Sequence, residues 1–441
     1  MVFCKQQHRH PVTLSPCHLV ILLFFFLAAC RIDDPLALPA ATAYPAATAV
    51  SLPTATPVPY PAAGRPETSA VPVRTIASPA QLTRHVYLPF VVNQQALLET
   101  AVITPTPLPI PTSAPTPTIT PIPTVDFTAV QADLRAQGQE LSYVKIGFHV
   151  GVGGNSRGLE DWMRQLDAAG VPFFLKSVDN AQPILLAQEL MRAGGVPHVL
   201  VYRKTAGDDY DWDVPNYDAP PEVAAEIHWQ MHRDAFPPEL DPSLVWIETI
   251  NEVDKNQSEW LAEFALATAN MAIRDGFNWA AFGWASGEPE PEQWQGPAMT
   301  EFLRFAGNHP DRVAIALHEY SYLQDDIGDA YPYKVGRFQE LLRIVDNQQI
   351  PRPTILITEW GWTYERVPEP EQALADVAWA ARLYGRYPSV KGAAIWYLGS
   401  GFDQIANRAQ KLIEPVTQYT LQHYFAHSQQ QLPVDVEGNR P

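Results

Sequence analysis

Two glutamates stand at the ends of apolar segments of the chain. Glu252 follows the apolar run 244–250 by way of Asn251, and Glu359 directly follows the apolar run 354–358. A carboxylate is costly to bury unless it has a partner or a task. Glycosidic bond cleavage needs two of them, one to protonate the leaving oxygen and one to attack or stabilise the anomeric carbon. The pattern therefore predicts Glu252 and Glu359 as a catalytic pair.

Other side chains suited to substrate binding stand at or near the ends of the apolar runs. Aromatic rings among them offer flat apolar faces for sugar rings. The candidates for substrate binding are Asn251, His318, Tyr320, Trp360, Trp396, His149 and Tyr202. All three cysteines lie within the first 30 residues. Their absence from the rest of the chain excludes zinc–thiolate sites, iron–sulfur clusters and a cysteine nucleophile there. We expect no metal and no cofactor.

From about residue 141, short apolar segments alternate with amphipathic ones. The expected strands are 143–150, 172–178, 198–203, 244–250, 279–284, 312–318, 354–358 and 392–397. The expected helices are 158–169, 181–193, 221–235, 258–275, 296–307, 333–347, 369–387 and 409–423. Continuous apolar runs are typical of strands buried on both faces of a parallel sheet. Eight such units predict an α/β fold, the (β/α)8 TIM barrel, in which the ends of strands four and seven lie at one face.

A doubly wound open sheet is the structural alternative. It often carries a glycine-rich nucleotide loop after its first strand. Residues 151–158 (GVGGNSRG) follow the first expected strand, but Ser156 stands where the third glycine of the dinucleotide fingerprint belongs. No Gly-Lys-Ser/Thr follows either, so this loop does not indicate nucleotide binding.

The residues around the two glutamates resemble those of the clan A glycoside hydrolases, which are retaining (β/α)8 enzymes similar to cellulases, xylosidases and xylanases. Asn251-Glu252 after strand four and Glu359 after strand seven match that clan in residue type and order. The resemblance covers about residues 141–425. It implies that Glu252 is the acid/base and Glu359 the nucleophile, and that Asn251 binds the sugar 2-hydroxyl.

The resemblance also implies roles for residues after strands six and eight. His318 and Tyr320 lie where the clan orients its nucleophile, and Trp396 lies where it places the floor of the −1 subsite. Two departures leave the specific family open. Val253 follows Glu252 where the clan often has proline, and Lys176 is the nearest basic residue to the end of strand two, where some families have arginine.

The N-terminus reads as a bacterial secretion signal. Lys5 and Arg9 precede the apolar run 19–29, which is too short to span a bilayer. Leu27-Ala28-Ala29-Cys30 resembles the lipobox of bacterial lipoproteins, which implies lipidation of Cys30 after removal of residues 1–29. We expect an extracytoplasmic protein that is lipid-anchored to the cell membrane or secreted. An ordinary cleaved signal with a chance cysteine is the alternative.

Residues 30–125 form the next expected segment. They contain 19 of the 43 prolines, together with many alanines and threonines. This composition predicts a disordered linker, because it cannot bury a core. We expect the barrel to cover 126–430 and a short tail to cover 431–441.

The charge of the chain limits its partners. Residues 126–441 carry 24 Lys and Arg against 44 Asp and Glu, a net charge of −20. Nucleic-acid binding is excluded because it needs a basic face. The acidic run 208–213 offers oxygen ligands for Ca²⁺ at alternating positions, but it lacks the glycine and terminal glutamate of an EF-hand calcium loop. We interpret it as a solvated loop, with a calcium site as the alternative.

The sequence therefore predicts a monomeric retaining glycosidase on a surface lipoprotein, with a carbohydrate substrate. The alternative is a catalytically inactive carbohydrate-binding lipoprotein with the same fold. The sugar, the linkage and exo or endo action stay open.

Overall fold

The computed structural model describes residues 125–441 except 208–210, 323–324, 363–365, 432 and 437–439. The expected signal peptide, Cys30 and almost all of the linker lie outside the described residues. Within the described part of the chain, no helix is long and apolar enough to cross a membrane.

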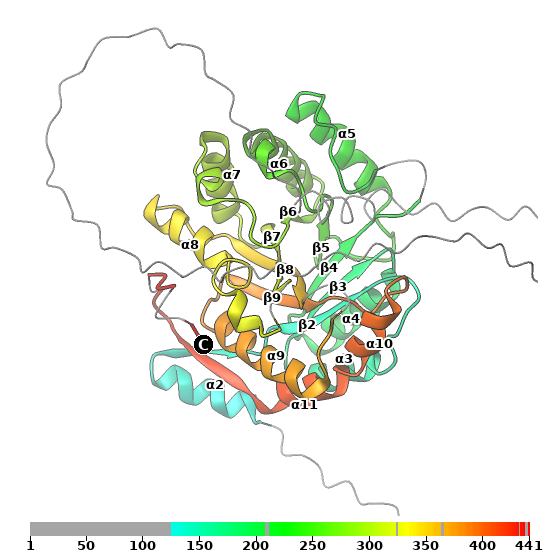
Figure 1. Ribbon diagram of the computed structural model, residues 1–441, viewed down its shortest axis with the longest axis vertical. Coiled ribbons are helices and arrows are strands. Elements are labelled where there is room, and N and C mark those ends of the chain that lie inside the picture. Colours follow the sequence, from blue (N-terminus) through cyan, green and yellow to red (C-terminus); the bar gives the residue numbers. More distant parts are fainter. Residues whose placement is uncertain (1–124, 208–210, 323–324, 363–365, 432, 437–439) are drawn as a thin grey trace, which may run out of the picture. The chain divides into compact units, whose positions relative to one another are not determined.

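Eight parallel strands close into a barrel (Figure 1). They are β2 (Ile146–Val150), β3 (Phe174–Val178), β4 (Val199–Arg203), β5 (Val245–Glu248), β6 (Asn278–Trp284), β7 (Val313–Tyr320), β8 (Thr354–Gly361) and β9 (Val390–Ile395). Each pairs with the next in chain order, and β9 pairs back to β2 to close the ring. This confirms the predicted TIM barrel.

Helices lie between the strands around the barrel. They are α3 (Leu159–Ala168), α4 (Ala181–Gly194), α5 (Pro221–Asp234), α6 (Ser258–Arg274), α7 (Pro297–Asn308), α8 (Phe338–Asn347) and α9 (Pro370–Gly385). Each buries one stripe of apolar side chains against the strands, as Leu341, Leu342 and Val345 do on α8. The helix expected at 409–423 is divided into α10 (Asp403–Gln410) and α11 (Ile413–Gln422).

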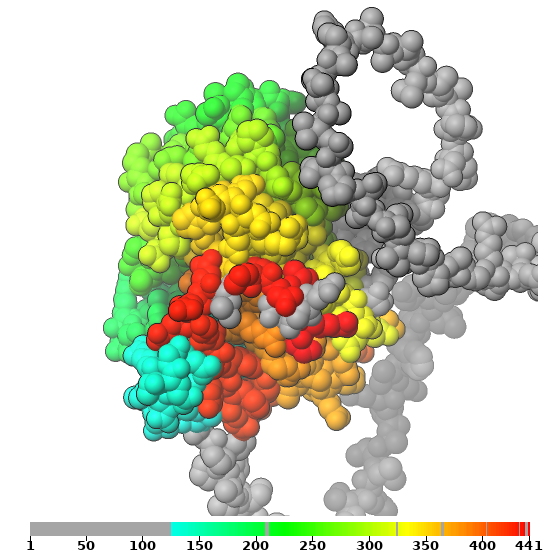
Figure 2. Space-filling model, turned by 90° about the vertical axis from the view of Figure 1, so that its left-hand side faces the viewer, coloured from blue at the N-terminus to red at the C-terminus, as the bar shows by residue number. Residues whose placement is uncertain are grey.

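The two ends of the described chain pair with each other outside the barrel. After helix α2 (Phe127–Ala136), strand β1 (Gln139–Tyr143) pairs antiparallel with β10 (Tyr424–Ser428). Figure 2 shows the N-terminal segment in cyan against the C-terminal segment in red. The expectation of one strand over 143–150 was therefore wrong at its start, because Tyr143 belongs to β1 and β2 begins at Ile146.

Apolar side chains fill the inside of the barrel. Phe174 and Leu356 meet four alanines of β6, β7 and β9 there, together with Val201. The layer is a packed core and not a pore, as in other barrels of this type. Polar and charged side chains begin immediately beyond it, toward the C-terminal ends of the strands.

Candidate active site

A β-bulge in β8 turns Glu359 into the barrel. Leu317 of β7 pairs with Ile357, but the next residue, His318, pairs with Glu359, so Thr358 is an extra residue in β8. Leu356 faces the barrel interior, and strict alternation from it would turn Glu359 outward. The extra residue shifts the alternation by one, because a bulge inserts one residue without a partner.

Basic and hydroxyl groups surround the Glu359 carboxylate. Glu359 is only 7% exposed. Its Oε2 accepts a hydrogen bond from the Tyr320 hydroxyl at 2.8 Å, and its Oε1 accepts one from Lys176 Nζ at 3.3 Å. Three further nitrogens lie near its oxygens: Arg203 Nη1 at 3.4 Å, His318 Nδ1 at 3.6 Å and His149 Nδ1 at 4.0 Å. The carboxylate is buried with more than one cationic partner.

These neighbours determine the charge of the Glu359 side chain. Burial alone would raise the pKa of its carboxyl, but His318, Lys176 and Arg203 together hold that pKa well below its usual range. Burial and the nearby Glu359 charge raise the pKa of the Tyr320 phenol well above its ordinary value. At neutral pH, Glu359 is therefore an anion, and Tyr320 is a neutral hydrogen-bond donor to it.

Glu252 lies near Glu359 in a more open setting. It follows the end of β5 with a left-handed backbone (φ +46°), and its N–H donates to the Gly283 carbonyl at 2.8 Å. Its side chain is 31% exposed, and Oε1 lies 3.3 Å from His318 Nδ1. The same ring nitrogen lies 3.6 Å from Glu359 Oε2. One imidazole nitrogen thus faces both carboxylates, so the two glutamates belong to one site.

A buried ion pair lies beneath Glu359. Lys176 Nζ is 2.6 Å from Glu248 Oε2, and both side chains are fully buried. Glu248 also accepts a hydrogen bond from the Thr358 hydroxyl at 2.7 Å. Burial would raise the pKa of Glu248, but the Lys176 and Arg203 charges lower it. Sequence reasoning assigned none of these residues, although an acid within an apolar strand should itself have signalled a buried cation.

Asn251 and the loop after β4 are joined by Arg203. Arg203 donates through Nη1 to the Asn251 side-chain oxygen, and its Nε lies 3.5 Å from Asp213 Oδ1. The Asp213 carbonyl accepts from the Asn251 N–H at 3.1 Å. Asp213 is only 4% exposed, so the expectation of a solvated loop was wrong at this position. Residues 208–210 of that loop lie outside the described residues.

Aromatic rings and His149 form one wall of the cleft. The half-buried Trp396 ring stacks on Tyr397, with centroids 5.2 Å apart, and meets Tyr320 edge-on at 6.2 Å. The His149 ring lies 5.2 Å from Tyr397. Burial, and then the Lys176 charge, hold the pKa of His149 well below its ordinary value, so its imidazole is neutral. Neither His149 ring nitrogen has a hydrogen-bond partner among the described residues.

Two of the expected binding residues point away from the cleft. The Tyr202 ring packs edge-on against Phe236 at 5.9 Å, and the Trp360 ring packs against Trp362 at 5.1 Å without any exposure. Both belong to the layer between strands and helices, so their expected contact with substrate is wrong. The reason is alternation: Arg203 faces inward next to Tyr202, and Glu359 faces inward next to Trp360.

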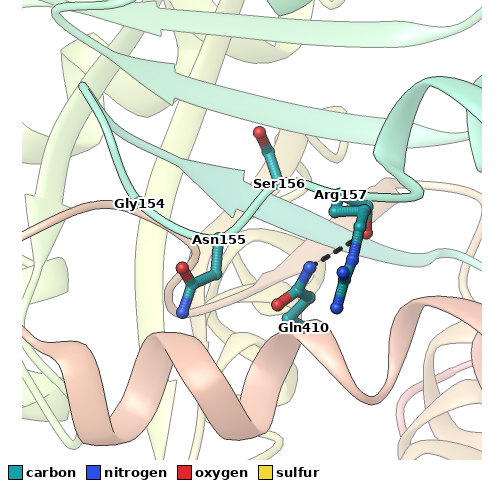
Figure 3. A pocket seen from close by; sticks show the side chains of 5 residues that line it. All are labelled: Gly154, Asn155, Ser156, Arg157 and Gln410. Carbon is teal, nitrogen blue, oxygen red and sulfur yellow. Dashed lines mark hydrogen bonds between the residues drawn. The ribbon is translucent and has the colours of Figure 1, made fainter. Parts of the chain in front are cut away.

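The loop after β2 borders a separate open depression of about 550 Å³. Figure 3 shows its lining residues, which are Gly154, Asn155, Ser156, Arg157 and Gln410. Gln410 Nε2 donates to the Arg157 carbonyl at 3.3 Å, which ties α10 to the loop. None of the residues around the two glutamates lines it, so the depression is not the cleft that holds them. Among the described residues, no group of three or more His, Cys, Asp and Glu side chains is placed to hold a metal ion.

No protein-family model and no curated protein sequence matches this chain. Among solved structures, XacCel5A is similar at 14% identity, covering 58% of this chain and 90% of its own, with a TM-score of 0.33. SrfJ from Salmonella typhimurium is similar at 9% identity, covering 66% of this chain and 79% of its own, with a TM-score of 0.36. The tryptophan synthase α-subunit of Pyrococcus furiosus follows at 10% identity, covering 64% and 97%, with a TM-score of 0.28. At such values none of these likenesses assigns an activity, and the barrel fold follows from the chain's own strand pairing.

Proposed function

We propose that this chain is a retaining O-glycosyl hydrolase that cleaves an extracellular oligo- or polysaccharide by a two-glutamate double displacement. The proposal rests on the positions of Glu359 and Glu252. Both carboxylates lie close to the same His318 nitrogen, but their surroundings differ. One is a buried anion and the other reaches solvent. Two carboxylates set apart in this way can serve as nucleophile and as proton donor.

In the first step, a carboxylate oxygen of Glu359 attacks the anomeric carbon while the glycosidic bond breaks. Glu252 gives its proton to the leaving oxygen, so the product is an alcohol and a glycosyl ester of Glu359. Tyr320 holds the nucleophile by its hydrogen bond. Trp396, whose ring meets Tyr320 edge-on, offers an apolar face to the sugar ring.

In the second step, the Glu252 carboxylate takes a proton from water. The water oxygen then attacks the anomeric carbon and releases Glu359 as a carboxylate. The partial exposure of Glu252 suits this exchange, because the same oxygen must meet first the leaving group and then water. Direct attack requires the two carboxyl groups to be about 5–5.5 Å apart, which is compatible with their shared contact to one ring nitrogen.

The Glu359→Gln variant tests the proposal on a panel of aryl glycosides and oligosaccharides. It keeps the shape and removes the nucleophile, so we expect turnover to fall at least about a thousandfold while oligosaccharide binding survives. The first sugar product of the wild type, followed by NMR, should keep its anomeric configuration. An inverted product would contradict the double displacement. Wild-type binding without turnover on any glycoside would instead favour the carbohydrate-binding lipoprotein.

The Glu252→Ala variant tests the role of the acid/base separately. We expect it to affect poor leaving groups most, because activated aryl glycosides do not need the proton in the first step. Added azide should then restore turnover, since a small anion attacks the glycosyl-enzyme without a base. Equal loss on good and poor leaving groups would contradict the role given to Glu252 while leaving that of Glu359 in place.

We further propose that Cys30 carries a lipid that anchors the protein to the cell membrane. The support is the tetrapeptide Leu27-Ala28-Ala29-Cys30 after an apolar signal. Cys30→Ser should release the protein from the membrane fraction or block its maturation. Cys17→Ser is the matched control, since that cysteine precedes the apolar run, and its partitioning should not change. Unchanged partitioning of Cys30→Ser would refute the anchor.

A further inference from the structure

A second cavity lies at the end of the barrel opposite the two glutamates. Its volume is about 250 Å³. The first residues of β3, β4 and β9 line it from the barrel side, and residues of β1 and β10 line it from the other. It therefore lies between the N-terminal ends of the barrel strands and the two-stranded sheet.

Two lysines line this cavity. Lys145 and Lys391 both line it, and none of its lining residues is acidic. Lys145 Nζ donates to the carbonyls of Tyr384 and Tyr387 at 3.1 and 2.9 Å, at the C-terminal end of α9. Within the described part of the chain, no carboxylate forms an ion pair with either lysine. Asp311 acts on Lys391 by its charge but does not line the cavity. In a region with a net charge of −20, two neighbouring lysines in a cavity without an acidic lining residue point to an anionic ligand.

A buried hydroxyl lines the same cavity. Ser142 is 4% exposed, and among the described residues its Oγ has no hydrogen-bond partner. A buried hydroxyl is unfavourable when it stays unpaired, so a ligand that bonds to it gains affinity. Burial, and then the charge of Lys391, lower the pKa of the neighbouring Lys145 to about 7, so an anion between the two lysines would favour its charged form.

Apart from Tyr143 and His427, the remaining lining residues are apolar. Pro172, Pro197 and Pro388 contribute rings without a backbone N–H, and Phe173 and Val390 lie beside them. Such a wall offers no hydrogen bond to an inorganic anion. It does offer contact to a hydrocarbon group that enters with the anion.

We propose that this cavity binds a small organic carboxylate, with its charged group between Lys145, Lys391 and the Ser142 hydroxyl and its apolar body against the three prolines. Most small-molecule sites have volumes of about 300–1,000 Å³. This cavity is smaller, which restricts the ligand to about the size of benzoate. The site is independent of the proposed hydrolase activity because the glutamates lie at the other end of the strands.

Calorimetry on the full chain with benzoate, benzyl alcohol and inorganic phosphate tests this assignment. We expect benzoate to bind, and benzyl alcohol, which is neutral and of similar shape, to bind at least about tenfold more weakly. Absence of benzoate binding at millimolar concentration would overturn the proposal. Phosphate binding as tightly as benzoate would also overturn it, because the apolar wall would then contribute nothing. Glycosidase assays in the presence of benzoate keep this result separate from the proposed function.

Two variants locate the site. Lys391→Gln should weaken benzoate binding at least about fivefold, because it removes one of the two charges, and Ser142→Ala should weaken it less. Lys391 is exposed at the cavity mouth, so its replacement does not disturb the core. Lys411→Gln is the matched control, since that exposed lysine does not line the cavity. The affinity of this variant for benzoate should stay at the wild-type value. Wild-type affinity in both Lys391→Gln and Ser142→Ala would place benzoate elsewhere and refute the assignment.

Discussion

The two glutamates of the cleft differ in what surrounds them. Glu359 is buried among four basic side chains and the Tyr320 hydroxyl, whereas Glu252 contacts His318 and reaches solvent. Beneath them, Lys176 joins Glu359 to the buried Glu248. This lysine compensates two carboxylates at once.

The Lys176→Met variant should change both stability and the acid limb of activity. Removing one partner of a buried ion pair costs about 3–5 kcal/mol. The pKa of Glu359 should rise, so the acid limb of kcat/KM should move to higher pH. A carboxyl whose pKa is depressed in the folded state stabilises the fold only while it is ionised. On acidification, the variant should therefore lose this stabilisation at a higher pH than the wild type does. Urea unfolding and a pH profile on aryl glycosides measure the two effects.

Lys176→Arg is the control for this prediction because it keeps the charge. Its acid limb should stay close to that of the wild type even if packing costs it some stability. An unchanged acid limb in Lys176→Met would show that the lysine does not set the charge of Glu359.

Residue types were easier to predict than side-chain directions. Glu252, Glu359, His318 and Trp396 lie around one cleft in the structure, as their places at strand ends indicated. Tyr202 was chosen instead of its neighbour Arg203, which is the one that faces the cleft. In a strand buried on both faces the apolar run does not alternate, so the sequence carries no signal for which neighbour points inward.

Among the elements, all eight barrel strands overlap the segments predicted for them, because each contains a short apolar run. Strands β1 and β10 were missed since they come from the two ends of the domain and their pairing is not local. The bulge at Thr358 was missed as well, because the residues that pair across it belong to another strand. That bulge decides whether Glu359 faces the cleft or a helix.

A buried carboxylate joins strand β7 to the segment just before helix α8 and to helix α9. Glu319 accepts hydrogen bonds from the Gly336 N–H at 2.8 Å and the Tyr384 hydroxyl at 2.6 Å. Burial raises its pKa from 4.5 to about 7, although these hydrogen bonds act in the opposite direction. Between pH 4.5 and about 7, Glu319 therefore keeps its proton in the folded state, whereas the unfolded state has already released it.

The Glu319→Gln variant should reveal this linkage, because it should change how the free energy of unfolding depends on pH. A raised carboxyl pKa means that stability is lost as pH rises from about 4.5 to 7, by up to roughly 3 kcal/mol from this group. The stability advantage of the wild type over Glu319→Gln should therefore shrink across that interval in urea unfolding. Glu371→Gln is the control, because Glu371 is exposed at the start of α9, and it should leave the slope unchanged. A constant difference between wild type and Glu319→Gln would contradict the raised pKa.

At the scale of the whole molecule, the barrel has two different ends. The C-terminal ends of its strands carry the glutamate cleft, and the N-terminal ends border a cavity with two lysines. The sheet formed by β1 and β10 covers this second end, with Leu141 and His427 lining the cavity. Residues 127–143, which form α2 and β1, are thus part of the folded unit and not an extension of the linker.

Limited proteolysis of the full chain should show where the folded unit begins. The composition of the linker predicts cleavage between about residues 40 and 125. Phe127 and Leu134 of α2 are buried, and β1 pairs with β10 along its whole length, so the resistant fragment should start near Asp126 and keep the unfolding midpoint of the full chain. A fragment starting at Val144 would lack α2 and β1, and we expect it to unfold at a lower urea concentration because β10 loses its partner. Equal midpoints for the two fragments would show that α2 and β1 add nothing to the fold, and a resistant fragment that retains the proline-rich stretch would refute the predicted linker.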